Sequence, residues 1–169
     1  MMFLIETDRL IITEFTPDMA RAVHLNSLDD DNRRFVPDEV FETEEEASET
    51  IAFLMSRYGG SSGPFVFPVL LKTGENIGYV QAVPVSGGWE AGYHIALPYT
   101  KHGYATEALS AFLPAIMRKI GIVQIKGICL SDNIASRRVM EKCGFVLLSE
   151  GKGDYQGSVR DICTYCFYA

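Results

Sequence analysis

Three strand-like stretches that follow one another closely constrain the fold of this chain more than any other feature. Residues 65–72, 76–85 and 89–97 are rich in apolar side chains, and only the glycine-containing turns 73–75 and 86–88 separate them. Turns this short join antiparallel neighbours in a sheet. The middle of the chain is therefore predicted to form three antiparallel strands, whose apolar faces need helices to cover them.

The flanking segments supply further helices and strands. Before the three strands we expect a strand over 9–15, a helix over 17–25 with Thr16 as its N-cap, a charged loop over 29–34, and a helix that begins at a capping box of Thr43 and Glu46 and ends near Tyr58. After them we expect a helix over 104–120 with Pro114 on its solvent side, a strand over 122–130, a helix over 134–142 ended by Gly144, and strands over 145–150 and 159–167 joined by a polar loop over 151–157. This order of elements predicts an α+β fold with a mixed sheet and helices on its faces.

Composition limits the classes of protein to which the chain can belong. With 169 residues, 47% of them hydrophobic, the chain is expected to form one domain over 1–169. Its 15 basic and 22 acidic side chains give a formal charge of −7, which disfavours nucleic-acid binding and favours a cationic partner. No signal-peptide pattern is visible, and no apolar run approaches the roughly 20 residues that span a bilayer, so no membrane association and a cytoplasmic location are expected. The sequence leaves the oligomeric state open between a monomer and a homodimer.

The four cysteines are expected to be free thiols. Cys163 and Cys166 have the spacing of a metal-binding or redox pair, but they lie in a strand-like stretch, where residues three apart point to opposite faces. No second pair and no nearby histidine completes a metal site. We therefore expect reduced, structural cysteines and no bound metal.

The stretch 97–108 carries the first chemical signal, because small residues stand where a strand passes into a helix. Gly103 and Ala105 leave the backbone uncovered at the helix start, and Thr106 adds a hydroxyl donor. Unpaired N–H groups and the positive end of the helix dipole favour an anion at such a position. Taken alone, the pattern fits an ordinary tight turn as well as a diphosphate site.

A second polar element follows the next strand. Asn133 leaves an apolar strand, and Ser136 comes three residues later on the first turn of the next helix. The Asn133 side chain can cap that helix or hydrogen-bond an amide-rich ligand. The two elements occur in order and close together, which favours a ligand site over two independent turns.

At these residues the chain resembles the GCN5-related N-acetyltransferase (GNAT) superfamily, and within it the ribosomal-protein N-acetyltransferases of the RimJ and RimL type. The resemblance rests on four segments: residues 6–10 are similar to the branch's "ETxRLxLR" start, 90–93 to its "E-x-G-Y" strand, 103–108 to its "GYATEA" loop and helix, and 133–145 to its "NxxSxxVxEKxGF" ending. It implies a central, twisted, mostly antiparallel sheet of seven strands, splayed between the fourth and fifth strands and flanked by about four helices.

The resemblance also implies acetyl-CoA as the cosubstrate and a primary amine as the acceptor. The residues expected to bind the cofactor are Ile95 and Leu97 through their backbones, His102, Gly103, Tyr104 and Ala105 through theirs, and Thr106, Asn133 and Ser136 through their side chains. The superfamily's loop signature begins with Gln or Arg, where this chain has Thr100. That departure weakens one contact to the cofactor.

Acetyl transfer also needs a base for the amine and a donor for the departing thiolate. Glu90 is the first candidate for the base, with a surface strand carboxylate as the alternative, and strand alternation places His94 on its face. Many superfamily members have a tyrosine acid where this chain has Met140, so Ser136 is the candidate donor to the sulfur. Asp154 and Tyr155, in the expected late loop, are weaker candidates for contacts to the acceptor or for the base.

The sequence leaves three functions open. The first is direct transfer of acetyl to a primary amine such as a protein N-terminal α-amine. The second is an acetyltransferase for a small amine, such as a polyamine, an aminoglycoside or an amino acid. The third is a CoA-binding sensor that has lost catalysis. Both kinds of acceptor are cationic, so the acidic charge does not separate the first two.

Overall fold

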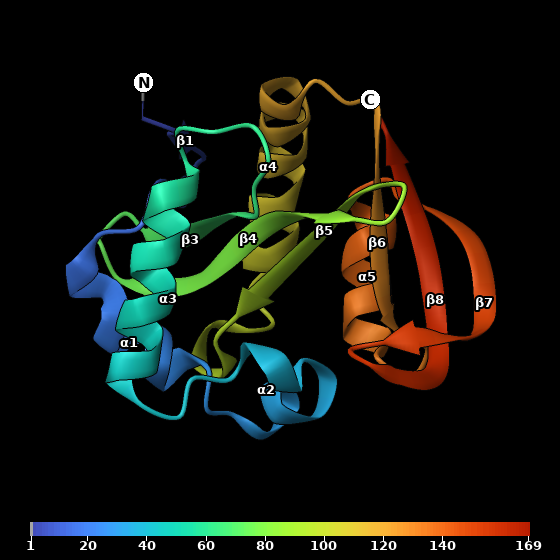
Figure 1. Ribbon diagram of the computed structural model, residues 1–169, viewed down its shortest axis with the longest axis horizontal. Coiled ribbons are helices and arrows are strands. Elements are labelled where there is room, and N and C mark those ends of the chain that lie inside the picture. Colours follow the sequence, from blue (N-terminus) through green and yellow to red (C-terminus); the bar gives the residue numbers. More distant parts are fainter. Residues whose placement is uncertain (1) are drawn as a thin grey trace.

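The computed structural model describes residues 2–169, which form one mixed sheet with helices on its faces (Figure 1). The sheet has eight strands in the order β1-β2-β3-β4-β5-β6-β8-β7. Their bounds are β1 (Ile5–Glu6), β2 (Leu10–Ile12), β3 (Phe65–Leu71), β4 (Asn76–Val85), β5 (Gly88–Ile95), β6 (Gln124–Leu130), β7 (Val146–Tyr155) and β8 (Ser158–Tyr168). All neighbours are antiparallel except β5 and β6, which are parallel.

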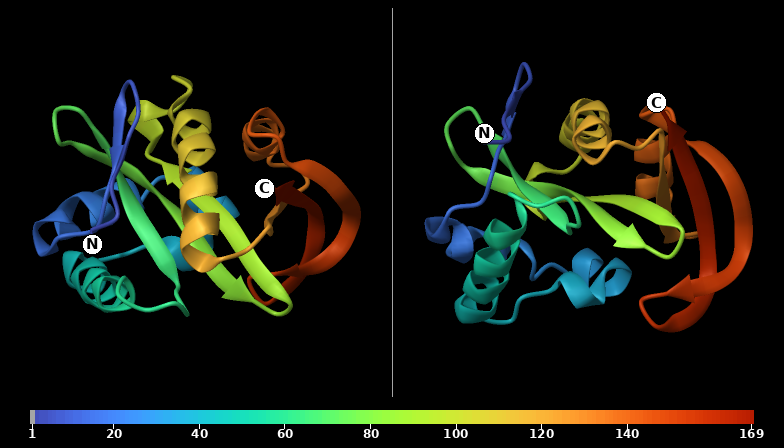
Figure 2. Two further views of the ribbon diagram at one scale, coloured as in Figure 1. Left: turned by 90° about the horizontal axis from the view of Figure 1, so that it is seen from above. Right: turned by 45° about the horizontal axis from the view of Figure 1, so that its top comes forward.

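The helices cover the sheet from both sides. Their bounds are α1 (Ala20–Asn26), α2 (Asp30–Phe35), α3 (Glu44–Arg57), α4 (Tyr104–Ile120) and α5 (Ile134–Lys142), with short 3-10 helices η1 (Pro17–Met19), η2 (Pro37–Glu39) and η3 (Leu97–Tyr99). Figure 2 shows α1 and α3 on one face of the β3–β5 part and α4 on the other. Apolar side chains of α3 and α4, such as Ile51 and Phe112, are fully buried in the same core as Phe65 and Phe67 of β3. Along residues 2–169, none of the helices combines the length and the apolar character needed to cross a membrane.

The sheet divides at the junction of β5 and β6. These strands pair only through Glu90 with Lys126 and Ala91 with Gly127. Beyond Ala91 and Gly127 they no longer pair, and we call this region the β5–β6 opening. It is the predicted splay between the fourth and fifth expected strands, so the predicted fold is confirmed. The eighth strand is the two-residue β1, which is too short to give a periodic signal.

The expected loop over 29–34 is wrong, because this stretch forms α2. The Asp29 side chain caps the helix by accepting the Asn32 N–H at 2.7 Å. Acidic residues occupy the first turn and basic residues the last, an order that complements the helix dipole. The run of charges is therefore a short helix on the surface of the fold and not a solvated connection.

The expected polar loop over 151–157 is also wrong, because β7 continues to Tyr155 and the strands turn only at Gln156 and Gly157. Both turn residues have positive φ, 50° and 83°, as a two-residue hairpin turn requires. A Cβ at Gly153 would lie 2.5 Å from Cδ1 of Ile162 on β8, so this glycine allows close strand packing. Glycine here signals a tight sheet and not a loop, and Asp154 and Tyr155 belong to a strand.

Other elements lie close to their expected places, with shifted ends. The first predicted strand shortens to β2, the helix predicted from residue 17 begins as η1, and Thr16 makes no side-chain hydrogen bond to the helix backbone. The Thr43 cap is confirmed, since its hydroxyl accepts the Glu46 N–H at 3.1 Å. Gly144 follows α5 with a φ of 95°, and Pro114 is exposed, both as expected. All four cysteines are free.

Candidate active site

The loop between β5 and α4 presents unpaired backbone N–H groups. The first N–H of α4 with an acceptor is that of Glu107, which donates to the Gly103 carbonyl at 3.0 Å. The N–H groups of Tyr104, Ala105 and Thr106 have no acceptor among residues 2–169. Gly103 caps the helix in the left-handed region, with a φ of 81°, which suits a residue without a side chain. This geometry can receive an anion.

Ile95 and Leu97, which precede this loop, differ in their backbone geometry. The Ala96 N–H donates to the Ile77 carbonyl of β4 at 2.8 Å. Because backbone directions alternate along a strand, the N–H and C=O of Ile95 point away from β4, toward the β5–β6 opening. Leu97 lies in η3 and not in the expected strand, and its side chain is exposed. Ile95 thus has the strand geometry expected for a backbone contact, and the role of Leu97 stays a prediction.

A hydrogen bond between β5 and α5 links the two sides of the opening. The Tyr93 hydroxyl of β5 donates to the Ser136 hydroxyl oxygen of α5 at 3.0 Å. Asn133 caps α5 by accepting the Ser136 N–H at 3.2 Å, so its carboxamide oxygen is engaged in the helix cap. Burial raises the pKa of Tyr93, which keeps its hydroxyl protonated. The Ser136 oxygen therefore accepts a hydrogen bond from Tyr93, and its own O–H can donate to another partner.

Met140 belongs to the core and not to the site. Its side chain is buried, and its sulfur would lie only 2.6 Å from a Cβ placed at Gly127 of β6. Two hydroxyl groups, those of Tyr93 and Ser136, lie in this region. The tyrosine hydroxyl comes from strand β5 and not from helix α5. Sequence reasoning did not assign Tyr93 a role, although it lies in the "E-x-G-Y" segment.

Cys143 joins α4 to α5. Its thiol accepts a hydrogen bond from the Ser110 hydroxyl at 3.3 Å, and burial raises its pKa. A thiol with a raised pKa is a poor nucleophile at neutral pH. This environment matches the packing role expected for Cys143 and not a covalent acetyl-enzyme.

The opposite face of β5 carries a carboxylate at the place where β5 and β6 still pair. The pairing of β4 and β5 has no register shift, with Tyr79 opposite His94 and Val83 opposite Glu90. Glu90 and His94 therefore share a face, as predicted. Burial, and then the negative charge of Glu39, raise the pKa of Glu90 to about 7, against the opposing effect of Lys126. A carboxylate with this pKa can accept a proton near neutral pH.

Glu39, which sequence reasoning missed, lies on the same face. Its carboxylate accepts hydrogen bonds from the Tyr79 hydroxyl and, at 3.0 Å, from Nε2 of Gln81. Burial raises the pKa of Glu39, and the two hydrogen bonds oppose that rise. A Cβ at Gly92 would lie 2.9 Å from Nε2 of Gln81, so Gly92 leaves the room in which Gln81 reaches Glu39. Only the fold brings η2 onto β4, and no local pattern marked Glu39.

Two further contacts close this face. Nε2 of His94 lies 3.6 Å from Oδ2 of Asp29, and the polar interaction with His94 lowers the pKa of Asp29. The Tyr155 hydroxyl of β7 donates to the Phe35 carbonyl at the end of α2. Burial, with the charges of Glu39 and Glu90, raises the pKa of Tyr155. Tyr155 thus lies on the Glu90 face and belongs to a strand, and its role toward the acceptor stays a prediction, as does that of Asp154.

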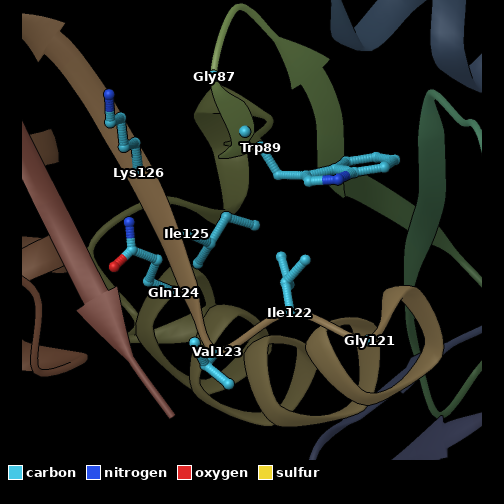
Figure 3. Close-up of a pocket in the computed structure, with 9 residues that line it drawn as sticks. Gly87, Trp89, Gly121, Ile122, Val123, Gln124, Ile125 and Lys126 are labelled. Atoms are coloured by element: carbon cyan, nitrogen blue, oxygen red, sulfur yellow. The ribbon is translucent and has the colours of Figure 1, made fainter.

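A separate cavity of about 300 Å³ lies at the other end of the β5–β6 junction (Figure 3). Trp89, Ile122 and Ile125 line it together with glycines at the ends of β5 and α4. These residues precede the two paired positions, whereas the loop, Tyr93 and Ser136 follow them. The cavity is therefore distinct from the candidate site, which is identified by its backbone donors and polar side chains.

A sheet that splits between β5 and β6, with a helix start of bare N–H groups beside the split, is the arrangement expected from the resemblance to the GNAT acetyltransferases. The family model described as "Acetyltransferase (GNAT) domain" matches residues 9–146. The chain belongs to this family. Acetyltransferases of this class take the acetyl group from acetyl-CoA and transfer it to an amine.

Individual relatives agree with this assignment. An uncharacterized N-acetyltransferase of Bacillus subtilis (strain 168), YnaD, is 33% identical over 143 residues, which are 83% of this chain and 81% of the relative. The crystal structure of a GNAT-family acetyltransferase from Bacillus anthracis has a TM-score of 0.83 and 27% identity, with 98% of both chains covered. RimL, a ribosomal-protein α-N-acetyltransferase solved in complex with coenzyme A, shares the fold, with a TM-score of 0.82, 18% identity and 98% of both chains covered.

Proposed function

We propose that this chain transfers acetyl from acetyl-CoA directly to a primary amine, and that a protein N-terminal α-amine is its preferred acceptor. The observation that carries the proposal is Glu90, half-buried beside Glu39, with its pKa raised to about 7. An α-ammonium group has a pKa of about 7.7–8.0, and an alkylammonium about 10.4. Proton transfer to Glu90 is nearly balanced for the first and strongly uphill for the second.

The cofactor side of the proposal rests on the bare backbone at the start of α4. Bound acetyl-CoA supplies the activated thioester. The N–H groups of Gly103, Tyr104 and Ala105 bind the diphosphate together with the His102 backbone, and Thr106 adds a hydroxyl donor. Ile95 and Leu97 orient the pantetheine arm through their backbones, and Asn133 holds the start of α5 beside it. The free N–H groups and the uncovered backbone at Gly103 fit such a ligand.

Two side chains then handle the charges of the reaction. Glu90 accepts the proton of the amine, directly or through one water molecule, so that a neutral nucleophile is available. Ser136 donates its O–H to the departing sulfur. The hydrogen bond from Tyr93 occupies an acceptor lone pair of Ser136 and orients the Ser136 proton away from Tyr93.

The preference for a protein N-terminus has one further support. The segments over 6–10 and 103–108 resemble the RimJ and RimL branch, and RimL itself shares the fold. The formal charge of −7 favours the approach of either kind of cationic acceptor and does not bear on this preference.

A thiol-release assay with acetyl-CoA tests the proposal against four acceptor classes: N-terminal peptides, polyamines, aminoglycosides and free amino acids. We expect the highest kcat/KM for the peptides, with a rate that rises through pH 7 as Glu90 ionises. Turnover only on polyamines or aminoglycosides would replace the acceptor assignment with a small amine. Calorimetric CoA binding without turnover on any class would point to a CoA-binding sensor.

A further inference from the structure

The N-terminal segment before β2 contacts the start of α4 through a cluster of polar interactions, and one cation is at its centre. Arg9 donates from Nη1 to the His102 carbonyl at 2.9 Å and from Nε to Oε1 of Glu107 at 2.7 Å. Its guanidinium also lies over the Tyr104 ring, 4.5 Å from the ring centroid. Three parts of the loop and first helical turn are thus held by one side chain from a distant part of the chain.

Glu107 completes the cluster from the helix side. Its Oε2 accepts the Thr7 hydroxyl at 2.6 Å and the Arg9 N–H at 3.1 Å. Burial opposes ionisation of Glu107, but the bonds from Thr7 and Arg9 outweigh it and lower the pKa. Glu107 is therefore an anion, and it lies in the first turn of the helix whose N–H groups must receive a diphosphate.

This arrangement creates an electrostatic problem that Arg9 resolves. A carboxylate in the first helical turn stabilises the helix but repels a second anion at the same N-terminus. Arg9 neutralises that charge, and its Nη2 lies 3.4 Å from the position of a Cβ at Gly103, directly beside the bare loop. Thr100, which stands where the superfamily's loop signature has Gln or Arg, carries no charge and donates its hydroxyl to the Leu97 carbonyl at 2.8 Å.

We propose that Arg9 is a positioning residue for cofactor binding, which fixes the loop at His102 and Gly103 and compensates the charge of Glu107 beside the diphosphate site. The inference rests on the proposed function, because it takes the α4 N-terminus as the place where CoA binds. The side chain acts through the loop and Glu107 and not through the thioester, so it affects cofactor affinity and not the chemical step.

Calorimetric titration with CoA tests this role in the full chain. Arg9→Gln is expected to weaken CoA binding about tenfold, the effect of losing one charge-assisted interaction. Arg9→Lys retains the charge but cannot bond His102 and Glu107 together, so an intermediate loss of about threefold is expected. In steady-state assays Arg9→Gln should raise the KM for acetyl-CoA and leave kcat unchanged, a split that general destabilisation of the fold would not produce.

The Glu107→Gln background separates the charge effect from loop geometry. Without the Glu107 charge, Arg9→Gln should cost less CoA affinity than it does in the wild type. Lys72→Gln is the matched control. Lys72 pairs at 3.3 Å with Glu6, which belongs to the same N-terminal segment as Arg9 but does not contact the loop. Loss of the Lys72 charge should leave CoA affinity unchanged.

The outcomes distinguish this inference from the proposed function. Failure of the wild-type chain to bind CoA would overturn both. CoA binding by the wild type that stays within twofold in Arg9→Gln, with the variant folded by circular dichroism, would overturn only the role of Arg9. That role would also be overturned if the loss in Arg9→Gln were as large in the Glu107→Gln background, or if Lys72→Gln weakened CoA binding equally.

Discussion

The two sides of the β5–β6 opening use different chemical groups: backbone N–H groups on one side and side chains on the other. On the cofactor side the donors are backbone N–H groups at the start of α4, made available by Gly103 and a helix that cannot pair its first turn. On the Glu90 face the chemistry depends on half-buried side chains, where burial raises the pKa of both Glu90 and Glu39, and the charge of Glu39 raises the pKa of Glu90 further. A site made of backbone is encoded by a short stretch of chain, whereas a site made of side chains depends on which elements meet.

The largest effect is expected for Gly103→Glu, which changes the loop whose backbone N–H groups are proposed to bind the cofactor. The substitution places a bulky anion in a left-handed position at the diphosphate site, and CoA affinity should fall at least about a hundredfold. Calorimetry measures the loss. Gly121→Glu is the matched control, because Gly121 ends the same helix with a φ of 82° and open space around it. Equal CoA affinity in Gly103→Glu and wild type would show that the cofactor binds elsewhere.

Glu90→Gln attacks the side-chain side and should lower kcat about a hundredfold while CoA affinity is retained. The pKa of Glu90 rises from its ordinary 4.5 to about 7 on folding, so its ionisation costs stability, and that cost is complete only above pH 7. The variant should therefore be more stable than wild type at pH 8, by about 3 kcal/mol, and no more stable at pH 4. Rate assays and urea unfolding at both pH values measure the two effects.

Glu49→Gln on the exposed side of α3 is the charge control for this variant and should change neither quantity. An unaltered kcat in Glu90→Gln at saturating substrates would remove Glu90 as the base. The stability effect is a separate readout, because it depends on the surroundings of Glu90 and not on the acceptor.

Tyr93→Phe tests the contact that links β5 to α5. Without the Tyr93 hydroxyl, the Ser136 O–H loses its orienting partner, and kcat should fall about tenfold with CoA affinity unchanged. The pre-steady-state rate of thiol release measures the step directly. Tyr168→Phe, at an exposed position near the end of β8, is the control. A Tyr93→Phe enzyme with wild-type kcat would show that Ser136 acts without this hydrogen bond.

The smallest effect is expected for Glu39→Gln, which removes a charge from the Glu90 face but keeps an acceptor for Tyr79. Glu90 faces Glu39 from η2, Lys126 from β6 and Tyr155 from β7, and loss of the Glu39 charge should lower its pKa. The acidic limb of the pH dependence of kcat/KM should move to lower pH, and the rate at pH 8 should change less than about threefold. Asp38→Asn, the exposed neighbour, should move this limb less. A limb that moves to higher pH would contradict the proposed coupling.

The sequence predicted well what local pattern controls. The three hairpin strands, α4 with its small first turn and α5 with its Asn133 cap were expected, because each depends on periodicity, turn residues or caps within one segment. The splay was expected only from the resemblance to the GNAT superfamily. Two segments were predicted wrongly for the same reason: charged residues over 29–34 and glycines over 151–157 look like loops until their packing partners are known. Gly153, for example, makes room for Ile162 of the neighbouring strand.

The amino-acid sequence by itself thus determined the fold and the family of this protein, and it also determined the backbone donors at Gly103, because a helix start is a property of consecutive residues. Only the tertiary structure decided that Glu39 meets Tyr79 and Gln81, that Tyr93 meets Ser136 and that Arg9 reaches His102 and Glu107. These contacts join segments that are far apart in the chain. Their energies depend on distance and burial in three dimensions, which no local pattern records.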